Sequence, residues 1–248
     1  MCSPARTESF NRAEERSPGG AVRLTQVKTA RAYTPTIEAV NAKEAMPGWT
    51  MGRTAHAGSS PPAARLAVPP GHVYPWYVRL IFALQRRRYG AELESARVWG
   101  RLPRSFLALT LLYRTLERRS SPFEPALRAL VLVRISQINW CAFCVDLNSA
   151  AALERAVAPE RLAALEDFER SPLFTEREKA ALAYAEALTD PARRVDDACF
   201  ARLRTHFDEQ ETLELTALAA FQNLSSKFNA ALGVPAQGFC SLTARKGV

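Results

Sequence analysis

The sequence lacks any apolar run long enough to cross a membrane. Its longest apolar stretches, residues 106–113 and 130–133, fall well short of the roughly 20 residues that a membrane-spanning helix needs. The N-terminal residues are charged and have no apolar run behind them, which is not the pattern of a secretory signal. We therefore expect a soluble, cytoplasmic protein without a membrane span.

Cysteine is also scarce. Five cysteines in 248 residues are too few and too scattered for a disulfide scaffold, and their odd number leaves at least one thiol unpaired. This usage favours a reducing compartment.

Positive charge is abundant but not concentrated. The net charge is +8 and the isoelectric point is about 9.6, yet the basic residues are spread over many segments. A nucleic-acid partner is therefore not predicted. The run Arg86-Arg87-Arg88 could touch an acidic surface or lipid headgroups, but such runs are more often solvated helix ends that favour the negative end of the helix dipole.

Strand alternation and internal repeats are missing too. Residues 1–71, rich in Ala, Pro, Ser, Thr and Gly, predict a disordered N-terminal arm within which Met46 and Met51 are alternative starts. Residues 72–240 predict one all-α domain with short connections, and residues 241–248 a C-terminal tail.

Four helices are predicted in the first part of this domain. The first covers residues 76–89 and stops at Gly90. The second follows Pro103 and has a predicted buried stripe of Phe106, Leu109, Leu112, Tyr113 and Leu116. The third, over residues 127–138, is apolar on nearly every side and belongs in the middle of a bundle. The fourth begins after Asn139 as its N-cap.

Polar residues mark further helix starts. Ser121 with Glu124, and Thr175 with Glu178, both have the form of a capping box. Asp196 or Asp197 can cap a short later helix, and Asp208 or Glu209 can open the last long one, which Gly233 and Pro235 close.

The pair Cys141 and Cys144 is the strongest functional signal. At the start of a helix, cysteines three residues apart lie on one face and can form a disulfide with little backbone movement. The positive end of the helix dipole would also stabilise a thiolate. The spacing and the apolar neighbours favour a redox-active dithiol.

The cysteines also have three other interpretations: burial in the core, zinc binding and a thioredoxin-like dithiol. For Cys199 and Cys240, burial as small core residues is the simplest interpretation. A zinc site would need a second half, but only those two cysteines with His72 and His206 remain in the domain, and none forms a second closely spaced pair. A thioredoxin-like fold would surround its dithiol with strands, which the sequence does not predict.

Residues 129–146, together with 175–185 and 214–224, resemble the carboxymuconolactone decarboxylase superfamily in its AhpD-like (alkylhydroperoxidase D-like) branch. The resemblance covers roughly residues 74–235. It implies an all-helical fold that assembles into homo-oligomers, trimers or hexamers, and a dithiol that reduces peroxides. It further implies that Cys144 attacks the peroxide, that Cys141 resolves the sulfenic acid, and that an external dithiol such as a lipoyl protein is the reductant. No metal, haem or flavin cofactor is implied.

Two positions depart from the pattern of that family. Its proton relay uses a Glu and a His where this chain has Ala129 and Asn148. Neither can act as an acid or base near neutral pH, although Asn148 can hydrogen-bond a thiol or thiolate one turn away. Asp146, two residues past Cys144, should lie on another face of the helix.

Three functions follow as hypotheses. The first is a thiol-dependent peroxidase-like or disulfide-exchange protein with Cys144, Cys141 and Asn148 at its site. The departures at Ala129 and Asn148 motivate a second, a non-catalytic helical oligomer acting as a redox sensor or scaffold. The third is a carboxymuconolactone decarboxylase-like lyase, although that chemistry does not require paired thiols.

Overall fold

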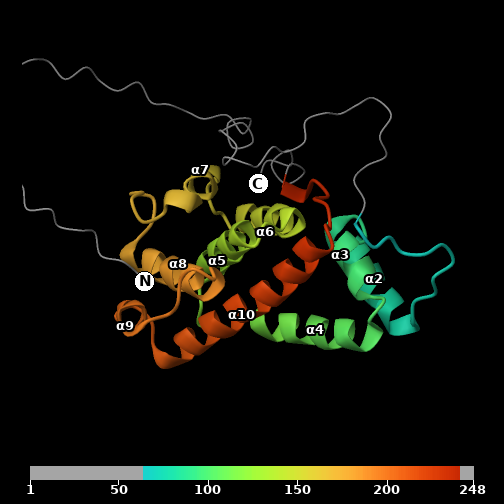
Figure 1. The fold of residues 1–248 in the computed structure, drawn as a ribbon, viewed down its shortest axis with the longest axis horizontal. Coiled ribbons are helices and arrows are strands. Elements are labelled where there is room, and N and C mark those ends of the chain that lie inside the picture. The colour runs from blue at the N-terminus through green and yellow to red at the C-terminus, as the bar shows by residue number, and fades with distance from the viewer. Residues whose placement is uncertain (1–63, 241–248) are drawn as a thin grey trace, which may run out of the picture.

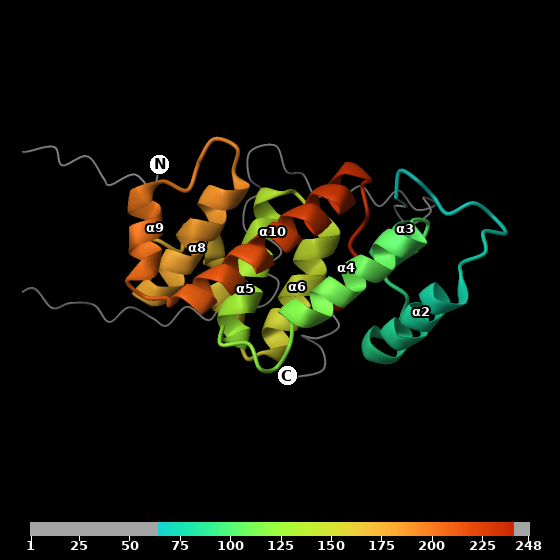
Figure 2. The same ribbon diagram turned by 90° about the horizontal axis from the view of Figure 1, so that it is seen from below.

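A computed structural model describes residues 64–240 of the protein. Within them every regular element is helical, and the helices form a bundle with α5 and α10 crossing its middle, as Figures 1 and 2 show. The predicted tail, 241–248, and residues 1–63 of the predicted arm lie outside the described residues. The elements are α2 (Trp76–Tyr89), α3 (Glu94–Trp99), α4 (Pro103–Leu116), α5 (Pro125–Ile138), α6 (Ala142–Glu154), α7 (Pro159–Ala163), the 3-10 turn η1 (Leu165–Asp167), α8 (Glu176–Thr189), α9 (Asp197–Arg204) and α10 (Glu209–Ala231).

Local signals place several helix ends where the sequence predicts them. Gly90 ends α2 with a φ of +77°, a left-handed conformation that glycine adopts without steric cost, and its N–H bonds to the carbonyl of Arg86 at 2.9 Å. Thr175 and Glu178 form a complete capping box at the start of α8. Asp208 caps α10 as predicted. These ends depend on neighbouring residues only, which is why the sequence predicts them.

The predicted capping box of Ser121 and Glu124 is wrong. Glu124 is itself the N-cap of α5, without a side-chain capping bond, and the helix begins at Pro125. The hydroxyl of Ser121 instead accepts the N–H of Phe123 at 3.2 Å and bonds to the carboxylate of Glu214. Proline suits the first helical position because it has no N–H to leave unpaired there, so Pro125 sets the start of the helix.

α5 lies at the centre of the bundle, as its composition predicts. It packs against α6, α8 and α10, and Leu130, Val131 and Ile135 are completely buried. The core has two parts. The first cluster joins α5 with α8, α9 and part of α10, whereas the second joins α2, α3 and α4 with the start of α6 and residues 234–239. Cys141 and Cys144 belong to the second cluster.

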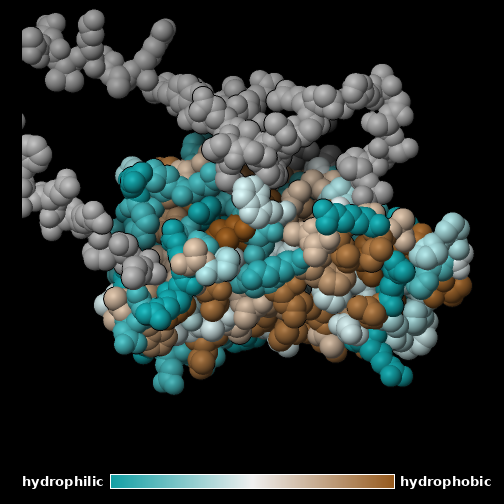
Figure 3. Space-filling model, viewed as in Figure 1, coloured by the Kyte–Doolittle hydropathy of each residue, from teal (hydrophilic) through white to brown (hydrophobic). Residues whose placement is uncertain are grey.

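The stripe predicted to be buried on α4 is only partly covered. Phe106 is buried, and Leu109 and Leu116 are half-buried against the core clusters, whereas Leu112 is 49% and Tyr113 39% exposed. α4 lies along one side of the bundle, where it contacts α2, α3 and α10, and the rest of its apolar surface faces outward. Figure 3 shows hydrophobic surface along the face where α4 and α10 lie. The pattern identifies an apolar stripe correctly, but it does not show whether this chain covers it.

The sequence patterns do not predict α3. This helix has six residues, its N-cap Leu93 makes no side-chain capping bond, and four of the six are buried. A helix of less than two turns shows little periodicity, so only its packing against α4 reveals it. α3 carries Ser95, which belongs to the candidate site.

Candidate functional site

A tight turn places the cysteine pair between α5 and α6. After α5 ends at Ile138, Trp140 adopts a left-handed φ of +55°, and the N–H of Cys141 returns to the carbonyl of Ser136 at 3.1 Å. Cys141 is the N-cap of α6, because its sulfur accepts the N–H of Cys144 at 3.2 Å. One sulfur of the candidate dithiol is therefore itself the capping group of α6.

The prediction that Asn139 is this N-cap is wrong. Asn139 is the C-cap of α5, and its side-chain amide donates to Asn223 and Ser226 of α10, both at 2.8 Å. The left-handed residue Trp140 separates it from α6, so its side chain points to a different helix. The helix start predicted by the sequence is correct within a few residues.

Cys141 and Cys144 form a disulfide in the second cluster. Their Cα atoms are 5.2 Å apart, within the usual range for a disulfide. They are 1% and 4% exposed. The pair is therefore buried together, and no side of it opens directly to solvent.

Two residues from other helices complete the surroundings of Cys144. The amide nitrogen of Asn229 on α10 donates to the sulfur of Cys144 at 3.4 Å. The amide oxygen of Asn229 accepts the hydroxyl of Ser95 on α3 at 2.8 Å. Asn229 is 1% and Ser95 8% exposed. Sequence reasoning missed both; the only available signal is a polar residue, Asn229, within the apolar stripe of the last helix.

Asn148 lies on α6 beside a separate polar cluster. Its amide donates to the hydroxyl of Ser136 at 3.0 Å, and Gln222 on α10 donates to the same oxygen at 2.9 Å. The hydroxyl of Ser136 in turn donates to the carbonyl of Leu132. Ala129 is buried in the first cluster, away from the side chains that surround the sulfurs. A role for Asn148 at a thiol thus stays a prediction.

Asp146 binds the chain that follows α10. Its carboxylate accepts the backbone N–H groups of Gln237, Gly238, Phe239 and Cys240 at 2.7 to 3.1 Å. This carboxylate therefore points away from the sulfurs, as its position two residues past Cys144 predicts. Burial, and then the negative charge of Asp146, raises the pKa of the half-buried Cys240 thiol.

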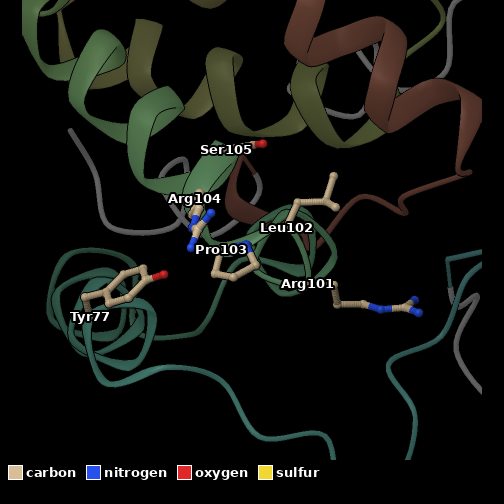
Figure 4. A pocket seen from close by; sticks show the side chains of 6 residues that line it. All are labelled: Tyr77, Arg101, Leu102, Pro103, Arg104 and Ser105. Atoms are coloured by element: carbon tan, nitrogen blue, oxygen red, sulfur yellow. The ribbon is translucent and has the colours of Figure 1, made fainter.

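Two cavities among the described residues lie away from the cysteines. A shallow pocket of about 270 Å³ lies at the start of α4 (Figure 4) and is lined by Tyr77, Arg101, Leu102, Pro103, Arg104 and Ser105. A cleft of about 420 Å³ is lined by residues from 72 to 97, including Arg79, Arg86 and Arg97. Neither contains a cysteine.

Between residues 64 and 240, no three His, Cys, Asp or Glu side chains come together as metal ligands would. No helix in that range is long and apolar enough to span a bilayer.

Comparison with known proteins points to one family. The sequence profile of the Carboxymuconolactone decarboxylase family matches residues 104–187. The chain is 42% identical over 181 residues, 73% of its length, to the whole of the uncharacterized protein YnjA of Escherichia coli K12. Among solved structures, an uncharacterized peroxidase-related protein from Ralstonia eutropha JMP134, with an alkylhydroperoxidase AhpD core, superposes with a TM-score of 0.63 at 21% identity; the match covers 73% of this chain and 96% of that one.

The debrominase Bmp8 superposes with a TM-score of 0.60, also at 21% identity, over 69% of this chain and 91% of that one. At these sequence identities the two structures are evidence for the fold alone. The family profile matches the segment that holds α5, α6 and the disulfide, and YnjA is matched over its full length. The chain therefore belongs to the carboxymuconolactone decarboxylase family and has an all-helical AhpD-like fold.

Proposed function

We propose that the protein is a thiol-dependent oxidoreductase that reduces peroxides or exchanges disulfides through Cys141 and Cys144. The main support is the disulfide at the start of α6, in which each sulfur accepts a hydrogen bond from a buried donor. Two thiols that can close into a disulfide hold two electrons for transfer. The family adds the expectation of a peroxidase-related activity.

The proposed cycle has three steps. The Cys144 thiolate attacks one peroxide oxygen, so that an S–O bond forms, the O–O bond breaks, and the leaving alkoxide takes a proton from water; Cys144 becomes a sulfenic acid. The thiol of Cys141 then attacks that sulfur, the disulfide forms and water leaves. An external dithiol, such as that of a lipoyl protein, reduces the disulfide by exchange and is itself oxidised. These steps require no metal, haem or flavin.

Burial and the missing acid–base groups lead us to expect slow turnover. Since Cys141 and Cys144 are almost inaccessible, peroxide and reductant must reach them through local opening. Ala129 has no titratable group, and the amide of Asn148 is bound to Ser136. General acid–base catalysis is commonly worth roughly 10²- to 10⁴-fold in rate, and these two positions cannot supply it.

A thiol-mapping experiment tests the proposal. Reduced protein is mixed with one equivalent of hydrogen peroxide or an alkyl hydroperoxide, and the thiols are mapped by mass spectrometry. We expect a disulfide between Cys141 and Cys144, and we expect Cys141→Ser to stop at a sulfenic acid or a mixed disulfide on Cys144. Cys199→Ser is the matched control, because Cys199 lies in the other cluster. Absence of the disulfide in the native sequence rules the proposal out.

A redox sensor or scaffold without turnover is the second candidate, favoured by Ala129 and Asn148. Asn148→His adds an imidazole at a half-buried position, whereas Ala129→Glu would place a carboxyl group at a site 1% exposed in the core. We therefore choose Asn148→His, and not Ala129→Glu, as the first variant that restores a group of the family's proton relay. Fast peroxide turnover by the unaltered protein with a dithiol reductant refutes this candidate. Carboxymuconolactone, offered as a substrate in parallel, tests the lyase alternative.

We also propose that the exposed apolar face of α4 and α10 is covered in a homo-oligomer, a trimer or hexamer. Leu111 is 55% and Leu224 51% exposed, and the ring of Tyr113 stacks on Phe221 between these helices at 5.7 Å. A continuous exposed apolar surface is typical of an interaction site. In sedimentation, Leu111→Glu should dissociate the assembly, whereas Leu84→Glu on α2, 48% exposed, should not. A native monomer contradicts the proposal.

A further inference from the structure

We infer that Asn229 is a catalytic residue of the dithiol and that Ser95 is its positioning residue: the amide N–H of Asn229 stabilises the sulfur of Cys144 as a thiolate. This inference rests on the proposed function, because it concerns the sulfur that attacks the peroxide. It is carried by the contacts of one buried amide with partners on two other helices.

The burial of Asn229 calls for an explanation. It is 1% exposed in an apolar cluster, where an amide that loses its water contacts costs free energy unless it is hydrogen-bonded. Its side-chain amide donates to the Cys144 sulfur at 3.4 Å and accepts from the Ser95 hydroxyl at 2.8 Å. An uncharged sulfur is a weak acceptor, whereas a thiolate accepts strongly. The amide therefore gains most when Cys144 carries the negative charge.

The two sulfurs are stabilised by different parts of the chain. Cys141, as N-cap, accepts the backbone N–H of Cys144 at 3.2 Å, a contact that the helix start supplies. Cys144 lies inside the first turn, and its donor is the side chain of Asn229. Without Asn229, the helix start would favour a thiolate on Cys141 over one on Cys144. Asn229 thus shifts the charge toward the sulfur that the proposed cycle uses first.

Ser95 orients the amide. Its hydroxyl donates to the side-chain oxygen of Asn229. This bond holds the amide so that its oxygen faces Ser95 and its nitrogen faces the sulfur of Cys144. A reversed amide would place the oxygen against the sulfur and repel a thiolate.

The charged groups on the surrounding helices have other partners or face solvent. Glu94 and Arg97 of α3 pair with each other, and Asp146 of α6 binds the backbone of residues 237–240. Lys227 of α10 is exposed, and Arg134 of α5 pairs with Glu186. Cys141 is the titratable group bonded to Cys144 in this structure, and replacing it with serine removes its thiol from the titration.

The test measures the alkylation rate of Cys144 against pH in the Cys141→Ser protein, with iodoacetamide and peptide mapping to separate Cys144 from other thiols. Asn229→Leu keeps a side chain of similar branched shape, removes the amide donor at the Cys144 sulfur and adds no charge beside it. We expect the apparent pKa of Cys144 to rise by about one unit, which is a tenfold fall in thiolate fraction below that pKa. Ser95→Ala should give a rise in the same direction but smaller.

Asn223→Leu is the matched control. Asn223 is on the same helix, and its amide contacts Asn139, Thr189 and its own helix, not a sulfur. An unchanged Cys144 pKa in Asn229→Leu, or an equal rise in Asn223→Leu, overturns the inference. If Asn229→Leu does not fold by circular dichroism, an unchanged Cys144 pKa in folded Ser95→Ala overturns the inference instead. Failure of the proposed function is distinct, because it appears as no peroxide-induced disulfide while the alkylation shift persists.

Discussion

Replacing Asp146 with alanine should release the segment that follows α10. One carboxylate holds four backbone N–H groups of residues 237–240 at 2.7 to 3.1 Å. The same segment is also held by Phe239, which is 6% exposed and contacts the ring of Tyr89 at 5.8 Å between centroids. Asp146→Ala removes the polar attachment and leaves the apolar one.

The magnitude follows from the number and kind of these bonds. A hydrogen bond to a charged group contributes about 1.5–3 kcal/mol net, but four donors share one half-buried carboxylate, and released N–H groups partly regain water. We therefore expect the free energy of opening of this segment to fall by about 2–3 kcal/mol, which is less than the sum of four independent hydrogen bonds. That corresponds to an increase of about 30- to 150-fold in the open population.

Amide hydrogen exchange of residues 237–240 is the direct assay. Their protection should fall by that factor in Asp146→Ala, and Cys240, whose N–H binds the same carboxylate, should react faster with a thiol reagent. Asp190→Ala is the matched control, because that carboxylate accepts a single backbone N–H, from Ala192 at 2.9 Å. Unchanged protection in Asp146→Ala would refute the assignment of this carboxylate as the main polar anchor of the segment.

Three further outcomes are expected. Thr175→Ala should lower the free energy of unfolding by about 1 kcal/mol in urea titration, because it removes the capping box of α8; an unchanged midpoint would contradict this. Gly90→Ala should lower the free energy of unfolding by about 1 kcal/mol in the same titration. The whole loss should come from the left-handed backbone conformation, since a Cβ there would meet no atom within 4 Å. Cys240 should alkylate only at a pH above that of an ordinary cysteine, since burial and Asp146 raise its pKa and so reduce the thiolate at neutral pH; a normal profile would contradict it.

The residue pattern alone predicts the all-helical character of residues 72–240, although not α3, together with several helix ends and the position of the dithiol. These features depend on residues a few positions apart: Gly90 ends α2, Thr175 and Glu178 open α8, and Cys141 lies three residues from Cys144. Where a competing local signal was stronger, the prediction failed, as with Pro125 setting the start of α5.

Tertiary structure decided the rest of the site. Asn229 lies 85 residues from Cys144 and 134 from Ser95, so no local pattern connects them. Packing also decided that Cys141 and Cys144 are buried and that Leu112 of α4 is exposed. Periodicity shows which residues of a helix share a face, but burial depends on which other helix covers that face, and that is settled only when distant segments come together.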